Sequence, residues 1–258
     1  MPKISVVMSV HNAANDLKAS IPGILGQGFK DFEFIIIDDG SKDKTLSVIK
    51  EYAATDPRII IISQANTGLT AALNRGAAIA KGEYIARQDA DDVSYPDRLE
   101  KQIRIMESDP SVVLVGGNCD DAYEDGFTAE WGAYGPEELQ DIVFLKTPFA
   151  HSTAMMRASV FRSLDGYDES FKTSQDMELW MRFAKAGKLA MVPEPVLKRR
   201  ITGASISVKR RWRQFYDALR ARWRHNRGAR RFLAVYHSLR SLIIGLLPLP
   251  AIKAWRRR

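Results

Sequence analysis

Short apolar runs alternate with stretches of helical spacing over the first 120 residues of the chain. The runs are rich in β-branched and aromatic residues and too short for a typical helix, so each predicts a strand. Between them, apolar residues recur at helical spacing, as in Leu69, Ala72 and Leu73. This alternation is typical of a mostly parallel sheet with helices on both faces, and we expect an α/β fold. The predicted strands are Ile4–Val10, Phe32–Asp38, Ile59–Ser63, Tyr84–Asp89 and Val112–Gly117.

The pattern weakens after residue 117. Residues 118–150 are rich in glycine, acidic and aromatic residues, and their weak periodicity predicts loop and irregular strand. A strand is expected again at Ser152–Met156, and a helix at Asp176–Ala186.

From about residue 208 the apolar residues follow a helical repeat in two successive segments. In the first they recur at i, i+3, i+4, i+7 and i+11, which places them on one face of a helix, with arginines over much of the rest. The second segment follows Gly228. The chain therefore ends in a basic amphipathic helical tail, whose apolar residues are Trp212, Phe215, Tyr216, Leu219 and Trp223, then Phe232, Val235, Tyr236, Leu239 and Ile243.

The formal net charge of +7 conceals a division between the body of the chain and this tail. Residues 208–258 contain 15 Lys or Arg and one acid, Asp217, whereas residues 1–207 contain 23 basic and 30 acidic residues. A basic block favours a polyanion, either a membrane surface or a nucleic acid. Basic, aromatic and amphipathic character together indicate a helix in a membrane interface, and packing on the domain through the aromatics is the alternative.

Three further features narrow the class of protein. The longest apolar run of the tail, Leu242–Ile252, has eleven residues, whereas a transmembrane helix needs about 20. The N-terminal apolar run ends at His11, before a signal sequence could form, so we do not expect secretion. The single cysteine, Cys119, excludes an internal disulfide framework and suits a reducing compartment.

Acidic and amide side chains follow the predicted strands. Open α/β sheets bind ligands at the carboxyl ends of their strands, where this chain has His11, Asp39, Asn66 and the triplet Asp89-Ala90-Asp91. Two carboxylates two residues apart in extended chain share a face, and Mg²⁺ or Mn²⁺ binds one or two carboxylates together with phosphate oxygens. Neither glycine-rich phosphate motif, GxGxxG or GxxxxGK[ST], is present. Carboxylates at the strand ends without a glycine-rich loop favour a site where a divalent cation binds a phosphate-containing ligand, and they give no support to a dinucleotide site.

Longer motifs carry a resemblance to a known family. They read ISVVMSVHN, FEFIIIDDGSKDKT, QANTGLTAALNRGAAIAKGEYIARQDADD, PDRLEKQ, HSTAMMRASVF, GYDESF, QDMELWMRFAKAG and SIS, in this order over residues 3–207. The chain resembles an inverting family 2 glycosyltransferase with the GT-A fold, of the bacterial surface-polysaccharide type. The resemblance implies a catalytic domain at 1–207, with a nucleotide-sugar half at 1–117 and an acceptor and catalytic-base half at 118–207. Residues 208–258 would then be membrane-associating helices.

The resemblance also implies roles for single residues. His11 would stack on the base of the nucleotide-sugar, and Asp39 would accept a hydrogen bond from it, which suits uracil or thymine. Asp89 would lie near the ribose, Asp91 would bind the Mn²⁺ or Mg²⁺ ion on the diphosphate, and Asp176 would be the general base. Asn66 and Arg87 would complete the donor site, and His151 and Trp180 would contact acceptor or phosphate. Where some members carry a histidine metal ligand, this chain has Thr202.

Some of these residues have a structural alternative. Asp38 suits the turn after its strand. Arg87 would either pair with a neighbouring aspartate or contact phosphate, and Trp180 would either lie in the core or stack on an acceptor sugar. His151 would otherwise be an ordinary surface histidine.

The expected activity is metal-dependent, inverting transfer of a sugar from a UDP- or dTDP-linked donor. The acceptor would be a hydroxyl of a glycan or lipid-linked glycan, and the protein would be cytoplasmic and peripheral on the inner face of an anionic membrane, without a nucleic-acid partner. A nucleotidylyltransferase is the second candidate, but it would carry a glycine-rich loop with a basic residue after the first strand, where this chain has Ser9–Ala13. A nucleic-acid-binding module built on the arginine-rich tail is the third.

Overall fold

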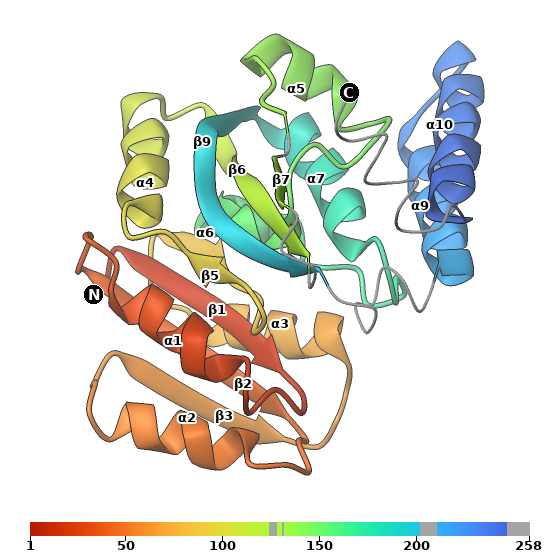
Figure 1. The fold of residues 1–258 in the computed structure, drawn as a ribbon. Helices are drawn as coiled ribbons and strands as arrows, with labels where there is room; N and C mark the ends of the chain where they lie inside the picture. Colours follow the sequence, from red (N-terminus) through yellow and green to blue (C-terminus); the bar gives the residue numbers. More distant parts are fainter. Residues whose placement is uncertain (124–127, 131, 202–210, 247–258) are drawn as a thin grey trace.

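A computed structural model describes residues 1–123, 128–130, 132–201 and 211–246. Within these residues nine strands form one sheet in the order β3-β2-β1-β4-β8-β6-β9-β5, with β7 paired to β6 (Figure 1). The strands are β1 Ile4–Val10, β2 Phe32–Asp39, β3 Ile59–Gln64, β4 Tyr84–Arg87, β5 Val93–Ser94, β6 Val112–Tyr123, β7 Thr128–Glu130, β8 Met155–Arg157 and β9 Lys188–Ile201.

The N-terminal half of the sheet is parallel. β1 pairs with β2 on one side and β4 on the other, so that Val10 lies opposite Asp38 and Val7 opposite Arg87. The remaining strands are mixed: β8 is antiparallel to β4 and β6, while β6 and β9 are parallel. The expected α/β fold is therefore confirmed. Strands β1 to β4, whose ends carry the acidic residues, are all parallel to one another.

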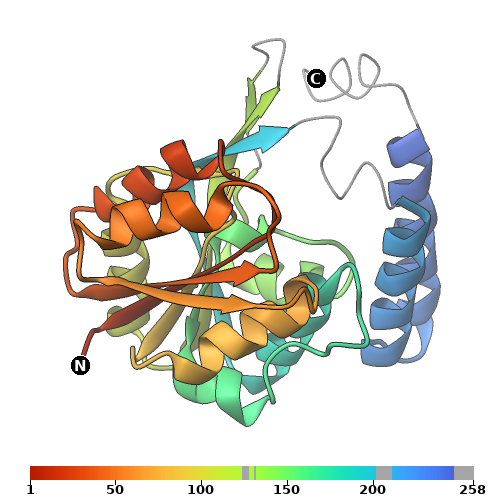
Figure 2. The same ribbon diagram turned by 90° about the horizontal axis from the view of Figure 1, so that it is seen from below.

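Helices cover both faces of this sheet because alternate side chains of each strand point to opposite faces (Figure 2). Val6, Met8 and Phe34 pack in one core, whereas Val7 and Ile35 pack in the other. The first core is covered by α1 Leu17–Leu25, α2 Thr45–Ala53 and α4 Arg98–Ser108. The second is covered by α3 Leu69–Ile79, α5 Pro136–Ile142, α6 Ala158–Ser163 and α7 Gln175–Ala186.

Helix α3 lies unusually close to the sheet at Gly76. A Cβ atom at this position would come within 2.5 Å of Ile37 Cδ1 and 2.8 Å of Val7 Cγ1. Only glycine permits this approach, because side-chain carbon atoms do not pack at such distances. The close contact sets the position of the β3–α3 loop, residues 65–68, at the carboxyl edge of the sheet.

Two expectations for the middle of the chain were wrong. The strand expected at Ser152–Met156 begins only at Met155, because His151–Thr153 forms a short 3₁₀ helix in which Thr153 Oγ1 donates to the Ala150 carbonyl at 2.7 Å. The region expected to be loop contains helix α5, which begins with Pro136 and buries only Leu139, so its apolar periodicity is weak. The expected division at residue 117 falls inside strand β6.

The tail forms the two expected helices, α9 Arg211–His225 and α10 Ala229–Leu246, which pack side by side next to α7 (Figure 1). Gly228, with a φ of 55°, makes the turn between them. No helix among the described residues is long and apolar enough to cross a bilayer. Three features of the sequence lie outside the described residues: Thr202, the expected domain boundary between 207 and 208, and the end of the run Leu242–Ile252.

Candidate active site

The first group of site residues surrounds Asp39, at the end of β2. Its buried carboxylate accepts hydrogen bonds from Gln64 Nε2, Thr67 N and Gly68 N, each at 2.8 Å, and from Thr67 Oγ1 at 3.1 Å. Burial alone would raise the pKa of Asp39, but these hydrogen bonds outweigh it and lower the pKa below its ordinary value. Asp39 is therefore an ionised carboxylate that holds the β3–α3 loop.

The exposed ring of His11, just after the end of β1, lies beside the main chain of Asp39. Its Nδ1 is 2.8 Å from the Asp39 carbonyl oxygen and 3.0 Å from Asn66 Nδ2, and its Nε2 is 3.1 Å from Asn12 Nδ2. With a proton on Nδ1 the ring donates to the Asp39 carbonyl oxygen and Asn12 Nδ2 donates to Nε2, and Asn66 Nδ2 is then a neighbour of Nδ1 without a hydrogen bond to it. The structure thus brings the predicted donor residues His11, Asp39 and Asn66 together.

The second group begins with an ion pair at the end of β4. Arg87 is 1% exposed, its Nη2 lies 2.5 Å from Asp89 Oδ1, and its Nη1 donates to the Gln88 carbonyl. Burial would raise the pKa of Asp89, but the positive charge of Arg87 in particular lowers it. Of the two interpretations of Arg87, the structure contains the pairing with Asp89.

Two further carboxylates, Asp91 and Asp92, lie on the turn that follows β4 and Asp89. The surrounding protein and the charge of Asp89 raise the pKa of the exposed Asp91 to about 6. Burial and both neighbouring carboxylates raise the pKa of Asp92 to about 8, and Ser152 Oγ donates to Asp92 Oδ2. This excess charge fits a cation. In the described part of the chain no group of three or more His, Cys, Asp or Glu could hold a metal ion. Mg²⁺ commonly binds only one or two carboxylates, together with waters and substrate phosphate oxygens.

Asp176 reaches the same region from the first turn of α7. Its Oδ1 accepts a hydrogen bond from Met177 N at 2.8 Å. Burial, and to a smaller extent the charge of Asp89, raises the pKa of Asp176 above its ordinary value. Asp89 and Asp176 are 87 residues apart in sequence, yet they lie close enough for the charge of Asp89 to raise the pKa of Asp176.

His151 and Trp180 lie behind these carboxylates. His151 Nε2 is 2.7 Å from the Tyr167 hydroxyl, and burial lowers the pKa of His151 to about 3, so the ring is neutral at physiological pH. Trp180 is fully buried and packs on the rings of Phe149 and His151. The structure thus contains the core alternative for Trp180, because α7 turns that side chain into the core.

Polar residues without a predicted role complete the site. Gln64 and Thr67 bind Asp39, and Tyr167 binds His151. The rule that identified Asn66, a polar residue just after a strand, applies equally to Gln64. Nothing in the local pattern marks Tyr167, which reaches the site from the turn after α6.

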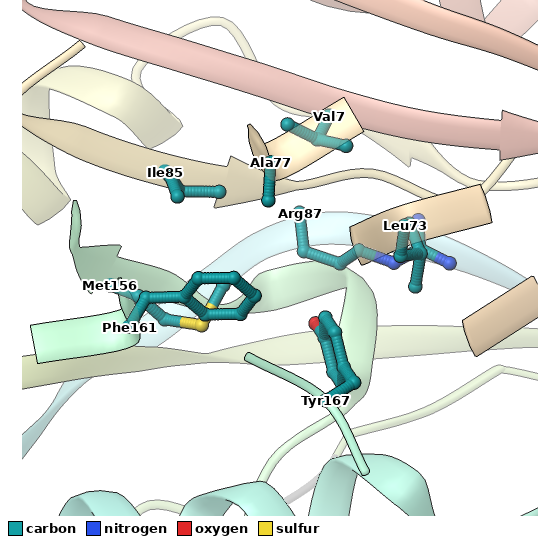
Figure 3. Close-up of a pocket in the computed structure, with 8 residues that line it drawn as sticks. All are labelled: Val7, Leu73, Ala77, Ile85, Arg87, Met156, Phe161 and Tyr167. Atoms are coloured by element: carbon teal, nitrogen blue, oxygen red, sulfur yellow. The ribbon is translucent and has the colours of Figure 1, made fainter. Parts of the chain in front are cut away.

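A small cavity of about 10 Å³ lies beneath the ion pair. Figure 3 shows Arg87 and Tyr167 on one side of it and apolar side chains, among them Met156 and Phe161, on the other. This volume holds roughly one water molecule. The cavity is therefore too small for any ligand much larger than water.

Comparison with known proteins decides the family. Residues 5–165, more than half of the chain, match the family described as Glycosyl transferase family 2. The chain is a family 2 glycosyltransferase.

Relatives of this glycosyltransferase include a Bacillus subtilis protein named as the glycosyltransferase EpsE. The two are 40% identical over 191 residues, which cover 72% of this chain and 68% of EpsE. An uncharacterized glycosyltransferase of Methanocaldococcus jannaschii is 34% identical over 238 residues, covering 88% of this chain and 81% of the relative. The enzyme class expected from the sequence motifs is therefore confirmed.

Solved structures show the fold. The mannosyltransferase PcManGT of Pyrobaculum calidifontis, in complex with GDP-Man and Mn²⁺, superposes with a TM-score of 0.72 at 18% identity, covering 99% of this glycosyltransferase and 79% of that chain. Residues 1–349 of S. aureus TarS, in complex with UDP-GlcNAc, give a TM-score of 0.70 at 16% identity, with 93% and 70% covered. The expected GT-A type of α/β fold is thus confirmed.

Replacement of Asp39 tests its role in the glycosyltransferase. Asp39→Ala leaves the amides of Thr67 and Gly68 without their acceptor, and we expect it to lower the free energy of unfolding at pH 7 by about 1–3 kcal/mol. Because folding lowers the pKa of Asp39, this contribution is complete above the ordinary value of 3.8 and is lost as the pH falls through the folded-state value. Urea unfolding between pH 7 and about pH 3 measures it.

Asp31→Ala, which removes an exposed carboxylate just before β2, is the matched control and should change stability by less than about 0.5 kcal/mol. Equal costs for the two variants, or a cost at Asp39 that does not change with pH, would contradict the role given to Asp39.

Proposed function

We propose that this enzyme transfers a sugar, with inversion, from a nucleoside-diphosphate sugar to a hydroxyl of a glycan or lipid-linked glycan in surface-polysaccharide synthesis. The observation that carries the proposal is the convergence of Asp89, Asp91 and Asp176. Two of these carboxylates follow strand β4 and the third lies in the first turn of α7, and the charge of Asp89 raises the pKa of both Asp91 and Asp176. Metal-assisted departure of a diphosphate and proton removal from an attacking hydroxyl require this set of groups.

The donor site would consist of His11, Asp39, Asn66 and Asp89. The ionised Asp39 suits the N–H of uracil or thymine, and the ring of His11 lies beside it for stacking. Asp89 would accept a hydrogen bond from a ribose hydroxyl. TarS bound to UDP-GlcNAc and the mannosyltransferase bound to GDP-Man support a nucleotide-sugar, and we favour a UDP or dTDP donor because of Asp39.

Asp91 would hold the divalent cation together with the diphosphate of the donor. Its exposed side chain and its raised pKa, which reflects uncompensated negative charge, support this assignment, as does the Mn²⁺ bound by the mannosyltransferase. A bound Mn²⁺ or Mg²⁺ stabilises the negative charge that develops on the departing nucleoside diphosphate.

Asp176 would accept the proton of the attacking hydroxyl. A raised pKa makes a carboxylate a better proton acceptor near neutral pH, and burial raises that of Asp176. His151, the other candidate in this region, is a poor proton acceptor because its pKa is lowered to about 3. A single displacement with one base, and no covalent nucleophile, inverts the anomeric carbon.

The helices α9 and α10 would bind an anionic membrane at the cytoplasmic face. The alternative was that their aromatics pack on the domain, yet Trp212 is 64% and Phe232 80% exposed. Exposed apolar side chains among arginines suit a membrane interface, where each basic residue contributes about 1 kcal/mol. The exposed apolar set is Trp212, Tyr216, Trp223, Phe232, Leu233, Tyr236, Leu239 and Ile243, which we call the outer face.

The donor and the metal are tested together by thermal unfolding. The panel is UDP-GlcNAc, UDP-glucose, dTDP-glucose and GDP-mannose, each with and without MnCl₂. A ligand of the native state raises the midpoint, and at 100 times its dissociation constant it contributes about 2.7 kcal/mol. We expect a uridine or thymidine donor to give a Mn²⁺-dependent shift that Asp91→Asn removes. The same shift in Asp91→Asn, or the same shift in excess chelator, would contradict the metal assignment.

The base is tested by Asp176→Asn, which keeps the shape of the side chain but cannot take up a proton. We expect turnover to fall by roughly 10²–10⁴ while the donor-induced thermal shift is retained. In the wild type, activity should fall as the pH drops through the raised pKa of Asp176, because the protonated base is inactive. Glu137→Gln, an exposed acid in the first turn of α5, is the control and should be fully active. Loss of donor binding with a high residual rate would make Asp176 a binding residue.

The outer face is tested by sedimentation with vesicles of phosphatidylglycerol and phosphatidylcholine. The variant Trp212→Ala, Tyr216→Ala, Phe232→Ala should bind at least tenfold more weakly, because burial of each such side chain contributes about 1.5–3 kcal/mol. Ile79→Ala, an exposed apolar residue on α3, should bind like the wild type. Unchanged binding of the triple variant would contradict the proposal, and tighter, salt-dependent binding to duplex DNA would favour a nucleic-acid role instead.

A further inference from the structure

The one acid of the basic tail is buried against the catalytic domain. Asp217 has no exposed surface, and its Oδ2 accepts hydrogen bonds from Thr173 N at 3.1 Å, Thr173 Oγ1 at 2.8 Å and Arg213 Nε at 3.0 Å. Burying a carboxylate is costly unless it is paired and hydrogen-bonded. The partner on the domain side is a single residue, Thr173, three positions before Asp176.

The segment that Asp217 holds, residues 171–175, makes a turn that needs support. Ser174 has a φ of 54°, a left-handed conformation that costs a non-glycine residue on the order of 1 kcal/mol. Its Oγ donates to the Gln214 carbonyl of α9 at 3.4 Å. Phe171, at the other end, packs in a small core with Ala221 of α9, and the guanidinium of Arg220 lies 4.4 Å from the centre of its ring. Helix α9 therefore contacts this segment along its length.

The first turn of α7 is held from the other side as well. Glu178, which is buried, accepts hydrogen bonds from Arg182 of its own helix and lies 3.0 Å from His225 Nε2 at the end of α9. Asp176 thus stands between two attachments to α9, Thr173 before it and Glu178 after it. Figure 1 shows α9 running beside α7 at this contact.

We propose that α9 positions the catalytic base, and that Asp217 is the positioning residue: by fixing Thr173 it fixes the turn at Ser174 and thereby the direction of Asp176. The tail then contributes to the transfer step itself, in addition to any surface that it binds. This inference rests on the proposed role of Asp176. A displacement of about 1 Å at a reacting group can lower the rate by about 10², so loss of this contact should affect turnover more than donor binding.

The test uses full-length Asp217→Asn, Thr173→Val and Thr173→Ser. The substrate is the member of the panel above that stabilises the enzyme most with MnCl₂, and the readout is nucleoside diphosphate released with water as acceptor. We expect Asp217→Asn and Thr173→Val to lower kcat by 10- to 100-fold, on the order of the positioning effect, and to move the acid limb of the rate profile, with the donor-induced thermal shift unchanged. Thr173→Ser keeps the hydroxyl and should retain wild-type kcat. Lys172→Ala, an exposed neighbour in the same segment, is the matched control.

A second readout needs no substrate. Hydrogen exchange of peptides covering 171–177 should be faster in Asp217→Asn and Thr173→Val than in the wild type, while peptides of β1 and β2 should be unaffected. If both variants only lower the midpoint of unfolding and leave kcat, the rate profile and exchange in 171–177 unchanged, the contact is purely structural and the inference is overturned. A fully active Asp176→Asn would instead overturn the assignment of the base, so the two failures are distinguishable.

Discussion

The buried guanidinium of Arg87 carries the positive charge on which the acidic edge of the sheet depends. It pairs directly with Asp89, and it also lowers the pKa of Asp91 and Asp176 against the burial that raises them. The charge of Arg87 also lowers the pKa of His151 and so helps to keep that ring neutral. This one fixed cation lowers the pKa of Asp89, whereas burial together with the charge of Asp89 raises the pKa values of Asp91, Asp92 and Asp176.

A second buried arginine holds Arg87 and the turn that follows it. Arg98, at the start of α4, donates to the Arg87 carbonyl at 2.6 Å, to Gln88 Oε1 at 2.8 Å and to Ser94 Oγ at 2.9 Å. Burial lowers the pKa of Arg98 to about 9, which reflects the cost of placing a guanidinium in the interior. Because the contacts are to backbone and neutral oxygens, Arg98 fixes the shape of the 87–94 turn without neutralising the carboxylates that the site requires.

The parallel strands and their polar ends could be predicted from sequence, because a strand buried on both faces is a continuous apolar run and its end exposes whatever follows. This reasoning found Asp39, Asn66, Asp89 and Asp91. It failed where burial depends on distant partners. Trp180 and Arg87 look suited to a ligand but face the core, and strand β9 was missed because it contains Pro193 and Pro195, which argue against a strand. In the tail, the sequence predicted an apolar stripe along the helices but not whether that stripe faces the domain or the solvent.

That orientation follows from what the domain presents to the tail. The loop before α7 offers the N–H and hydroxyl of Thr173, and α7 itself offers the buried carboxylate of Glu178. The Thr173 groups need a hydrogen-bond acceptor and the Glu178 carboxylate needs a donor, and α9 places Asp217 and His225 opposite them. Because α9 docks through Asp217, His225 and the small residue Ala221, its large apolar side chains such as Trp212 and Tyr216 face outward. The pairing of Asp217 with Thr173 therefore both supports the segment before Asp176 and leaves the outer face exposed, so the position of Asp176 and the orientation of that surface depend on the same contact.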